Sequence, residues 1–162
     1  MERIEYFLGI LVVLVYSLGT CQSTSSIQNR GDIAVLVNPS NPVDELSLSD
    51  LRRMLTGDRR FWQGNVQVKL ILPEPGSSER ERVFTIVLKA NDAEFTKEWM
   101  QKVFRGEATD LPLSLTSAAS AERYLISTPG GITFMRAKRS PGQLKVLRLD
   151  GKLPGDSGYV LR

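Results

Sequence analysis

Histidine is absent from the 162-residue sequence, and cysteine occurs once, at Cys21. Without histidine the chain has no Ser-His-Asp triad, no imidazole acid or base and no His-liganded metal site. A single cysteine forms neither an internal disulfide nor a cysteine cluster for zinc or iron–sulfur. The acidic residues also lack the paired spacing typical of glycosidase or metal chemistry. We therefore expect no enzymatic activity, no metal and no cofactor.

A concentrated block of one charge is also missing. The 21 lysines and arginines are interspersed with 18 aspartates and glutamates, for a net charge of +3. Binding of a nucleic-acid backbone needs a concentrated basic face, so a nucleic-acid partner is not expected. The hydrophobic content of 41% is ordinary for a globular protein, and the length suits one modest domain.

The N-terminal segment carries an apolar run from Tyr6 to Leu18. This run is too short for the ~20 residues of a membrane-spanning helix and suits the core of a secretory signal. The following Gly19-Thr20-Cys21 resembles a bacterial lipobox, although Thr20 replaces the usual Gly or Ala. We expect a signal segment over residues 1–21, with either lipidation at Cys21 or plain cleavage, and a polar tether over residues 22–31. An uncleaved N-terminal anchor is the alternative. Export places the protein in the periplasm or on the cell surface.

Residues 32–162 alternate predicted strands and helices and show no internal repeat. The continuous apolar run Ile33–Val37 predicts a buried strand, parallel to its neighbours and covered on both faces. Further strands are expected at Val66–Leu72, Ile132–Met135 and Leu144–Leu149. Helices are expected from Leu48 to before Gly57, from Ser78 to about Lys89, from Asn91 or Asp92 to before Gly106, and from Ser117 to Ile126. This order predicts an α/β domain with helices packed on a small mixed sheet.

Side-chain spacing predicts which helix faces are buried. The helix after Asn91 carries an apolar face of Phe95, Trp99, Met100, Val103 and Phe104, and the last helix directs Ala118, Ala121, Tyr124 and Leu125 inward. We expect a loop over Glu107–Leu115 and a polar tail after Asp150-Gly151. Trp62 and Trp99 are interpreted as packing residues, and the basic group of Arg136, Lys138 and Arg139 as a solvated loop.

A series of short motifs runs through the domain. It comprises an Asn-Pro crossing strand at Val35–Pro42, a helix ending at Gly57, Trp62, the turn Gly76–Arg80 with Phe84, then Trp99, Phe104-Arg105-Gly106 and Pro129-Gly130-Gly131-Ile132. Their order and spacing resemble the phosphate-type substrate-binding proteins of ABC transporters, from about Ile33 to Leu149. The resemblance implies a single lobe, the second, of a periplasmic-binding-protein-like fold, with half of the family's ligand shell outside it. Thr133 and Phe134 depart from the family's Gly-Tyr pair.

The resemblance implies an anion site at Gly76, Ser77, Ser78 and Arg80. Arg82 is the substitute, because Phe84 lies one residue further from Arg80 than in the family pattern. A helix that starts at Ser77 or Ser78 offers free backbone N–H groups to phosphate, and an arginine adds charge-assisted hydrogen bonds. In the alternative interpretation, Ser78 and Glu81 form a capping box and the arginines face solvent.

These features predict an exported domain that binds an oxyanion, phosphate by resemblance, without catalysis. The alternative is an extracytoplasmic protein-interaction module with a degenerate ligand site. The partners implied are an ABC transporter or another cell-envelope protein, and a second copy of the chain that completes the cleft.

Overall fold

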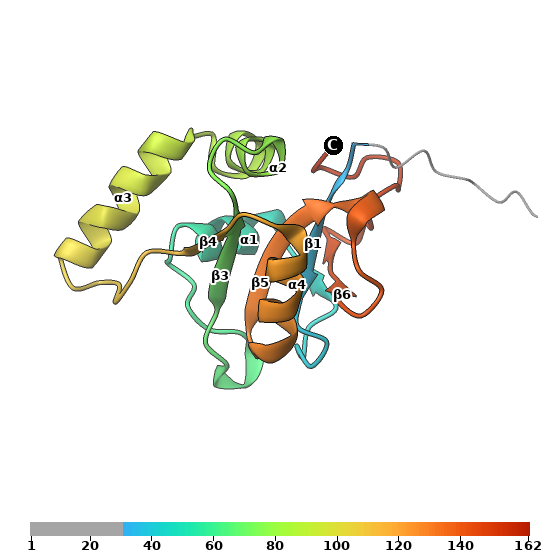
Figure 1. Cartoon of the computed structure of the whole chain (residues 1–162), viewed down its shortest axis with the longest axis horizontal. Coiled ribbons are helices and arrows are strands. Elements are labelled where there is room, and N and C mark those ends of the chain that lie inside the picture. The colour runs from blue at the N-terminus through green and yellow to red at the C-terminus, as the bar shows by residue number, and fades with distance from the viewer. Residues whose placement is uncertain (1–30) are drawn as a thin grey trace, which may run out of the picture.

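A computed structural model of the protein describes residues 31–162, so the predicted signal segment, Cys21 and nearly all of the tether lie outside the described residues. A five-stranded sheet with the order β4-β3-β5-β1-β6 forms its centre (Figure 1). The strands are β1 (Ile33–Val37), β3 (Lys69–Pro73), β4 (Leu113–Leu115), β5 (Gly131–Arg136) and β6 (Lys145–Val146). A separate parallel pair joins β2 (Glu45–Leu46) to β7 (Arg148–Leu149).

The sheet is mixed, as predicted. Strand β3 runs parallel to β4 and β5, whereas β1 runs antiparallel to β5 and β6. The predicted parallel direction of Ile33–Val37 is therefore wrong, although all five residues are buried. A continuous apolar run reports that both faces are covered, and it carries no information on the direction of the neighbouring strand.

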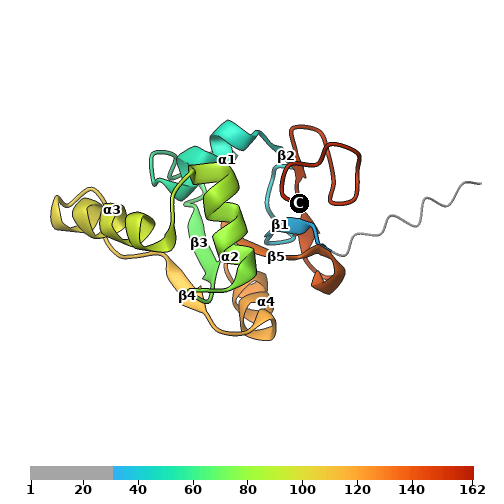
Figure 2. The same ribbon diagram turned by 90° about the horizontal axis from the view of Figure 1, so that it is seen from above.

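Helices cover both faces of this sheet (Figure 2). Helix α1 (Leu48–Leu55) and α2 (Ser78–Val83), which continues into the π-helical η2 (Phe84–Leu88), pack on one face, and α4 (Ala118–Ser127) packs on the other. Two short 3-10 helices, η1 (Gln63–Asn65) and η3 (Ala137–Arg139), lie in loops. Burial on two faces explains why β1 is apolar throughout.

Helix α3 (Asp92–Phe104) extends beyond the sheet edge at β4 (Figure 1). Asn91 caps it in a capping box with Glu94, as the Asn91 option predicts. Phe95 is buried and Trp99 and Val103 are partly buried, whereas Met100 is 57% exposed and Phe104 is 94% exposed. The predicted buried face is therefore wrong at Met100 and Phe104. Side-chain periodicity identifies the apolar face of a helix, but a neighbour must be present to bury it.

Helix α4 shows the same limit on a smaller scale. Ala121 and Leu125 are buried as predicted, whereas Ala118 and Tyr124 are exposed. The four residues span more of the helix circumference than the sheet face beneath them covers.

Several predicted boundaries shift because of pairings between distant residues. The strand expected at Val66–Leu72 begins at Lys69, since Gln67 forms a bridge to Phe61 instead. The strand expected at Leu144–Leu149 divides into β6 and β7 at the buried Leu147. The loop expected over Glu107–Leu115 contains β4, which pairs with β3.

The predicted polar tail is part of the core. Tyr159 and Leu161 are buried, and the Tyr159 hydroxyl donates a 2.7 Å hydrogen bond to the carbonyl of Ile33. Burial, with the nearby Asp32 carboxylate, raises the pKa of Tyr159 far above its ordinary value. Isolated apolar residues among glycines and aspartates produce no periodic signal, so the sequence pattern missed this packing. Within residues 31–162, no helix has the length and apolar character needed to cross a bilayer.

Candidate functional site

Three parallel strands end on the same side of the sheet, which we call the carboxyl edge. Strand β3 leads there into the turn before α2, β4 brings Ser114, and β5 ends at Arg136. Ligands of open α/β sheets bind outside the carboxyl ends of the strands. This edge therefore brings the predicted residues Gly76, Ser77 and Ser78 close to side chains from distant parts of the chain.

The turn before α2 is held by its own hydrogen bonds. The Ser77 N–H donates to the carbonyl of Glu74 at 3.0 Å, and the Ser77 hydroxyl accepts from the N–H of Arg80 at 3.4 Å. Ser77 is therefore the N-cap, and the predicted capping box of Ser78 with Glu81 is wrong, because Ser78 is already the first helical residue. Gly76 has a φ of +78°, and a Cβ placed on it would meet no atom within 4 Å.

Arg80 is buried in a structural network. Its Nε donates to Asp92 Oδ1 at 2.5 Å, and its Nη1 donates to the Pro73 carbonyl at 3.1 Å and to Ser114 Oγ at 2.8 Å. Its Cζ lies 5.2 Å from the centroid of the Phe84 ring. Within the described residues, only Nη2 of this guanidinium has no hydrogen bond to the protein. The side chain thus fastens α2 to β4 and to the start of α3.

Arg82 also lies at this end of the sheet, because Ile33 at the start of β1 pairs with Arg136 at the end of β5. Its Nη1 donates to the carbonyl of Gly31 at 2.6 Å. The structure thus places Arg80 beside the carboxyl end of β3, and it places Arg82 at the start of the domain.

A carboxylate of the chain itself lies at the start of α2. Glu79 Oε1 accepts from Arg136 Nε at 2.9 Å, and Glu79 Oε2 accepts from the Ser78 hydroxyl at 3.0 Å. The Ser78 Oγ in turn accepts from Arg136 Nη2 at 2.7 Å. Burial opposes ionisation of Glu79, but hydrogen bonds from its own backbone N–H, from Ser78 and from Arg136 outweigh it and lower the pKa of Glu79. The donors suited to an external anion therefore hold an internal one.

Arg136, Asp92 and Ser114 were not among the predicted site residues. A signal for Arg136 exists in the sequence, because it directly follows the predicted strand Ile132–Met135. Parallel pairing of that strand with the one before Ser78 brings both ends to the same edge. No local pattern marks Asp92 or Ser114, since their role depends on where α3 and β4 pack.

The two tryptophans pack within the domain, as predicted. Trp62 is buried and its Nε1 donates to the carbonyl of Gly130 at 2.9 Å. Trp99 donates from Nε1 to the carbonyl of Leu55 at 2.9 Å.

Comparison with solved structures gives clear matches. A phosphate ABC transporter substrate-binding protein from Clostridium perfringens, solved with bound phosphate, matches with a TM-score of 0.62 and 17% identity, over 76% of this chain and 46% of its own. An ABC-type phosphate transport receptor from Vibrio cholerae matches with a TM-score of 0.60 and 13% identity, over 76% and 48%. PstS from Borrelia burgdorferi matches with a TM-score of 0.64 and 14% identity, over 80% and 53%.

The chain has a periplasmic-binding-protein fold. It spans about half the length of these proteins. The expected resemblance to part of a phosphate-type substrate-binding protein is therefore confirmed at the level of the fold. No family model and no curated protein sequence matches the chain.

Proposed function

We propose that this chain binds a tetrahedral oxyanion, with phosphate as the first candidate, at the start of α2 and without catalysis. The observation that carries the proposal is the contact of Glu79 with Ser78 and Arg136, in which a hydroxyl, a guanidinium and the first turn of a helix hold an anion. Phosphate carries several acceptor oxygens and suits the same donors. Gly76, Ser77 and Arg80 shape the surrounding turn, and Arg82 lies at the same end of the sheet, bonded to the carbonyl of Gly31.

The proteins with the same fold support the choice of phosphate. The Clostridium perfringens structure contains bound phosphate, and the Vibrio cholerae protein is a phosphate transport receptor. We extend this ligand class to the present chain as part of the proposal.

Glu79 is a competitor for the external anion. A tethered group acts at an effective concentration of about millimolar or more, so phosphate must displace a carboxylate that is always at hand. We expect weak binding in the natural chain and tighter binding once the Glu79 charge is removed.

Calorimetric titration of the full chain with phosphate and with sulfate tests this function. The Glu79→Gln variant should bind phosphate roughly tenfold more tightly than the natural chain, and Arg136→Gln added to it should abolish the heat. Glu81→Gln is the matched control, because Glu81 is an exposed acidic residue of the same helix without an ion pair in residues 31–162. Absence of heat at millimolar phosphate in both the natural chain and Glu79→Gln contradicts the proposal.

A protein-interaction module is the second candidate function. The observation that favours it is α3, which extends from the domain and exposes Met100 and Phe104. The partner would be an ABC transporter, another cell-envelope protein or a second copy that completes the cleft. Sedimentation at increasing protein concentration tests whether two copies associate. If they do, the natural chain should self-associate and the Phe104→Ser variant should not.

We also propose that the protein is exported and functions in the periplasm or on the cell surface, with Cys21 as the lipidated residue. Intact mass after expression in a bacterium tests this proposal. An acylated species that begins at Cys21 supports it, and a species that retains Met1 contradicts it.

A further inference from the structure

A cavity of about 510 Å³ lies at the amino end of β3, opposite the end that leads to Ser78. The end of α1, residues 59–60, residues 67–71, α3, the segment 106–113 and Tyr124 of α4 line it. None of the residues assigned to the oxyanion site lies on its surface. The volume falls within the roughly 300–1,000 Å³ typical of sites for small organic ligands.

The cavity exists because part of the β3 edge is uncovered. The Val68 N–H donates to the carbonyl of Arg60 at 2.8 Å, and the Lys69 N–H donates on the opposite side to the carbonyl of Gly130, just before β5, at 3.0 Å. Successive N–H groups of a strand point to alternate sides, so Arg60 lies on the same side of β3 as β4. Strand β4, however, pairs with β3 only from Ile71 onward. The edge at Leu70 therefore faces a gap between Arg60 and β4.

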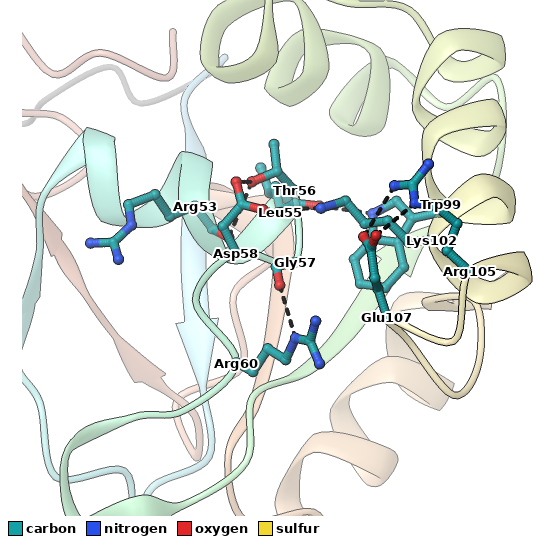
Figure 3. A network of polar contacts seen from close by, with 10 residues as sticks. All are labelled: Arg53, Leu55, Thr56, Gly57, Asp58, Arg60, Trp99, Lys102, Arg105 and Glu107. Atoms are coloured by element: carbon teal, nitrogen blue, oxygen red, sulfur yellow. Dashed lines mark hydrogen bonds and ion pairs between the residues drawn. The ribbon is translucent and has the colours of Figure 1, made fainter.

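Contacts from α3 hold the cavity open in a defined shape. Trp99 is bonded to the carbonyl of Leu55, and Lys102 Nζ donates to Asp58 Oδ1 at 3.0 Å (Figure 3). In Figure 3 the Arg60 guanidinium points toward the side chain of Glu107, with Trp99 beyond it. A site formed before binding loses less conformational entropy when a ligand enters.

The cavity surface is divided almost evenly between polar and apolar atoms, and its apolar part comes from aliphatic residues and two aromatic rings. Met54, Leu70 and Ile71 are buried beneath it, and the rings of Trp99 and Tyr124 stand at its sides. Such a surface favours an apolar ring or short chain, because burial of apolar area removes it from water. An inorganic anion gains nothing from this surface and would lose hydration there.

The charges around the opening leave a positive excess. Among residues 31–162, no carboxylate lies within ion-pair distance of Arg60 or Lys69, and Arg60 Nε donates only to the carbonyl of Gly57, at 3.2 Å. Glu107 is paired with Arg105 by two contacts, at 2.6 and 3.0 Å, and these contacts, with smaller contributions from the charges of Lys102 and Arg60, lower the pKa of Glu107. Lys102 is paired with Asp58, as described above. Arg59, a further lining cation, is paired with Asp50 at 2.8 Å, so Arg60 and Lys69 remain against Asp110, a lining acidic residue without an ion pair in residues 31–162.

We propose that this cavity binds a small organic monoanion that joins an apolar ring or short chain to one carboxylate or sulfonate. The charged group lies at the Arg60 guanidinium and the Lys69 ammonium, and the apolar part lies on Leu70 between Trp99 and Tyr124. This site is independent of the proposed oxyanion site, because the two lie at opposite ends of β3.

The probe for the test is 1-anilinonaphthalene-8-sulfonate, which carries one sulfonate on an aromatic body. Fluorescence and calorimetric titration of the full chain should show one saturable site. Octanoate should displace the probe, whereas octyltrimethylammonium, with an equal chain and a positive charge, should not. The concentrations of octanoate and of 1-naphthoate that displace the probe are then compared. The more effective competitor shows whether the site prefers an aliphatic chain or an aromatic ring.

Variants assign the binding to the cavity. Arg60→Gln should weaken probe binding roughly tenfold, and Lys69→Gln should weaken it several-fold, as expected for loss of a charge-assisted hydrogen bond. Ala108→Trp, which fills the cavity from its lining, should abolish binding. The matched control is Lys97→Gln, since Lys97 is an exposed cation of α3 outside the cavity and has no ion pair in the described chain.

Three results would overturn the proposal. They are the absence of a saturable site in the natural chain, unchanged affinity in Arg60→Gln together with Ala108→Trp, and equal displacement by the cationic amphiphile. Circular dichroism confirms that each variant is folded, and Lys97→Gln must keep the natural affinity.

Discussion

The guanidinium of Arg80 lies inside the domain with its Nε 2.5 Å from Asp92 Oδ1, and this contact links the first turn of α2 to the first turn of α3. The arginine side chain is 5% exposed, whereas the aspartate is 34% exposed. The buried Arg80 guanidinium is therefore paired with a carboxylate that stays in contact with solvent. In a chain expected to use Arg80 for ligand binding, this geometry gives the residue a structural role first.

Arg80→Ala should destabilise the protein by about 3 kcal/mol. The change removes three hydrogen bonds and leaves space beside Phe84 and Phe95, and loss of a buried ion pair or side chain typically costs this much. Urea unfolding followed by tryptophan fluorescence measures the free energy. Arg82→Ala is the control and should cost about 1 kcal/mol or less, because it removes one partly exposed hydrogen bond to Gly31.

Equal stability of the two arginine variants would contradict the buried network. The expected result also affects the choice of ligand-binding variants. Loss of anion binding in Arg80→Ala would report unfolding as readily as a lost contact. Arg136 is the better test position, since its side chain is 38% exposed.

Gly130→Ala should destabilise the protein by at least about 2 kcal/mol. A Cβ at Gly130 would lie 2.1 Å from the Gln67 carbonyl oxygen, and the φ of +78° is itself unfavourable for alanine. Gly76→Ala is a matched control, because Gly76 has the same φ and no atom within 4 Å of the added carbon. We expect it to cost about 1 kcal/mol, the conformational part alone. Thermal or urea unfolding of the two variants separates the steric part from the conformational part.

The fold could be predicted where the signal is local. The apolar run of β1, the helix start at Asn91 and the helix end before Gly57 all appear in the structure near their predicted places. These features follow from burial and backbone geometry within a few residues.

Features that depend on distant partners could not be predicted in this way. The direction of β1, the pairing of β4 and the packing of Tyr159 each require knowledge of which segments meet. The predicted anion site illustrates both cases. Its turn lies at the carboxyl end of β3 as the resemblance implies, but the occupation of that turn by Glu79 depends on Arg136, which lies 57 residues further along the chain.

Ser77→Ala should destabilise the protein by about 0.5–1 kcal/mol, and Ser78→Ala should cost less. The Ser77 hydroxyl accepts from the N–H of Arg80 as the N-cap, whereas Ser78 is exposed and contributes only to the surface contact with Glu79 and Arg136. Urea unfolding measures both variants. A larger loss of stability in Ser78→Ala than in Ser77→Ala would instead support the capping box of Ser78 with Glu81.

Stability should be nearly constant between about pH 6 and 8 and should fall at acidic pH. The chain has no histidine, which is the side chain that ordinarily titrates near neutrality. Hydrogen bonds from Thr56 and Lys102 outweigh burial and lower the pKa of Asp58, and the contacts at Glu79 described above act in the same direction. A carboxylate with a pKa lowered in the folded state stabilises the fold above its unfolded pKa, near 3.8 for Asp58 and 4.5 for Glu79. That stabilisation is lost as the pH falls through the folded pKa.

The test compares urea midpoints at pH 7 and about pH 3 in the natural chain, Asp58→Asn and Thr56→Ala. Asp58→Asn should lose stability at pH 7 and show a smaller drop on acidification, because the ionised group that produces the pH dependence is gone. Thr56→Ala should show an intermediate drop, since it removes the 2.7 Å hydrogen bond to Asp58 and leaves the Lys102 contact in place. Added salt should weaken the stabilisation of the fold by Lys102 and leave that by Thr56 unchanged. Only Lys102 forms an exposed charge pair with Asp58, whereas Thr56 donates a hydrogen bond from a neutral hydroxyl. An identical acid dependence in all three proteins would show that Asp58 does not stabilise the folded state through these contacts.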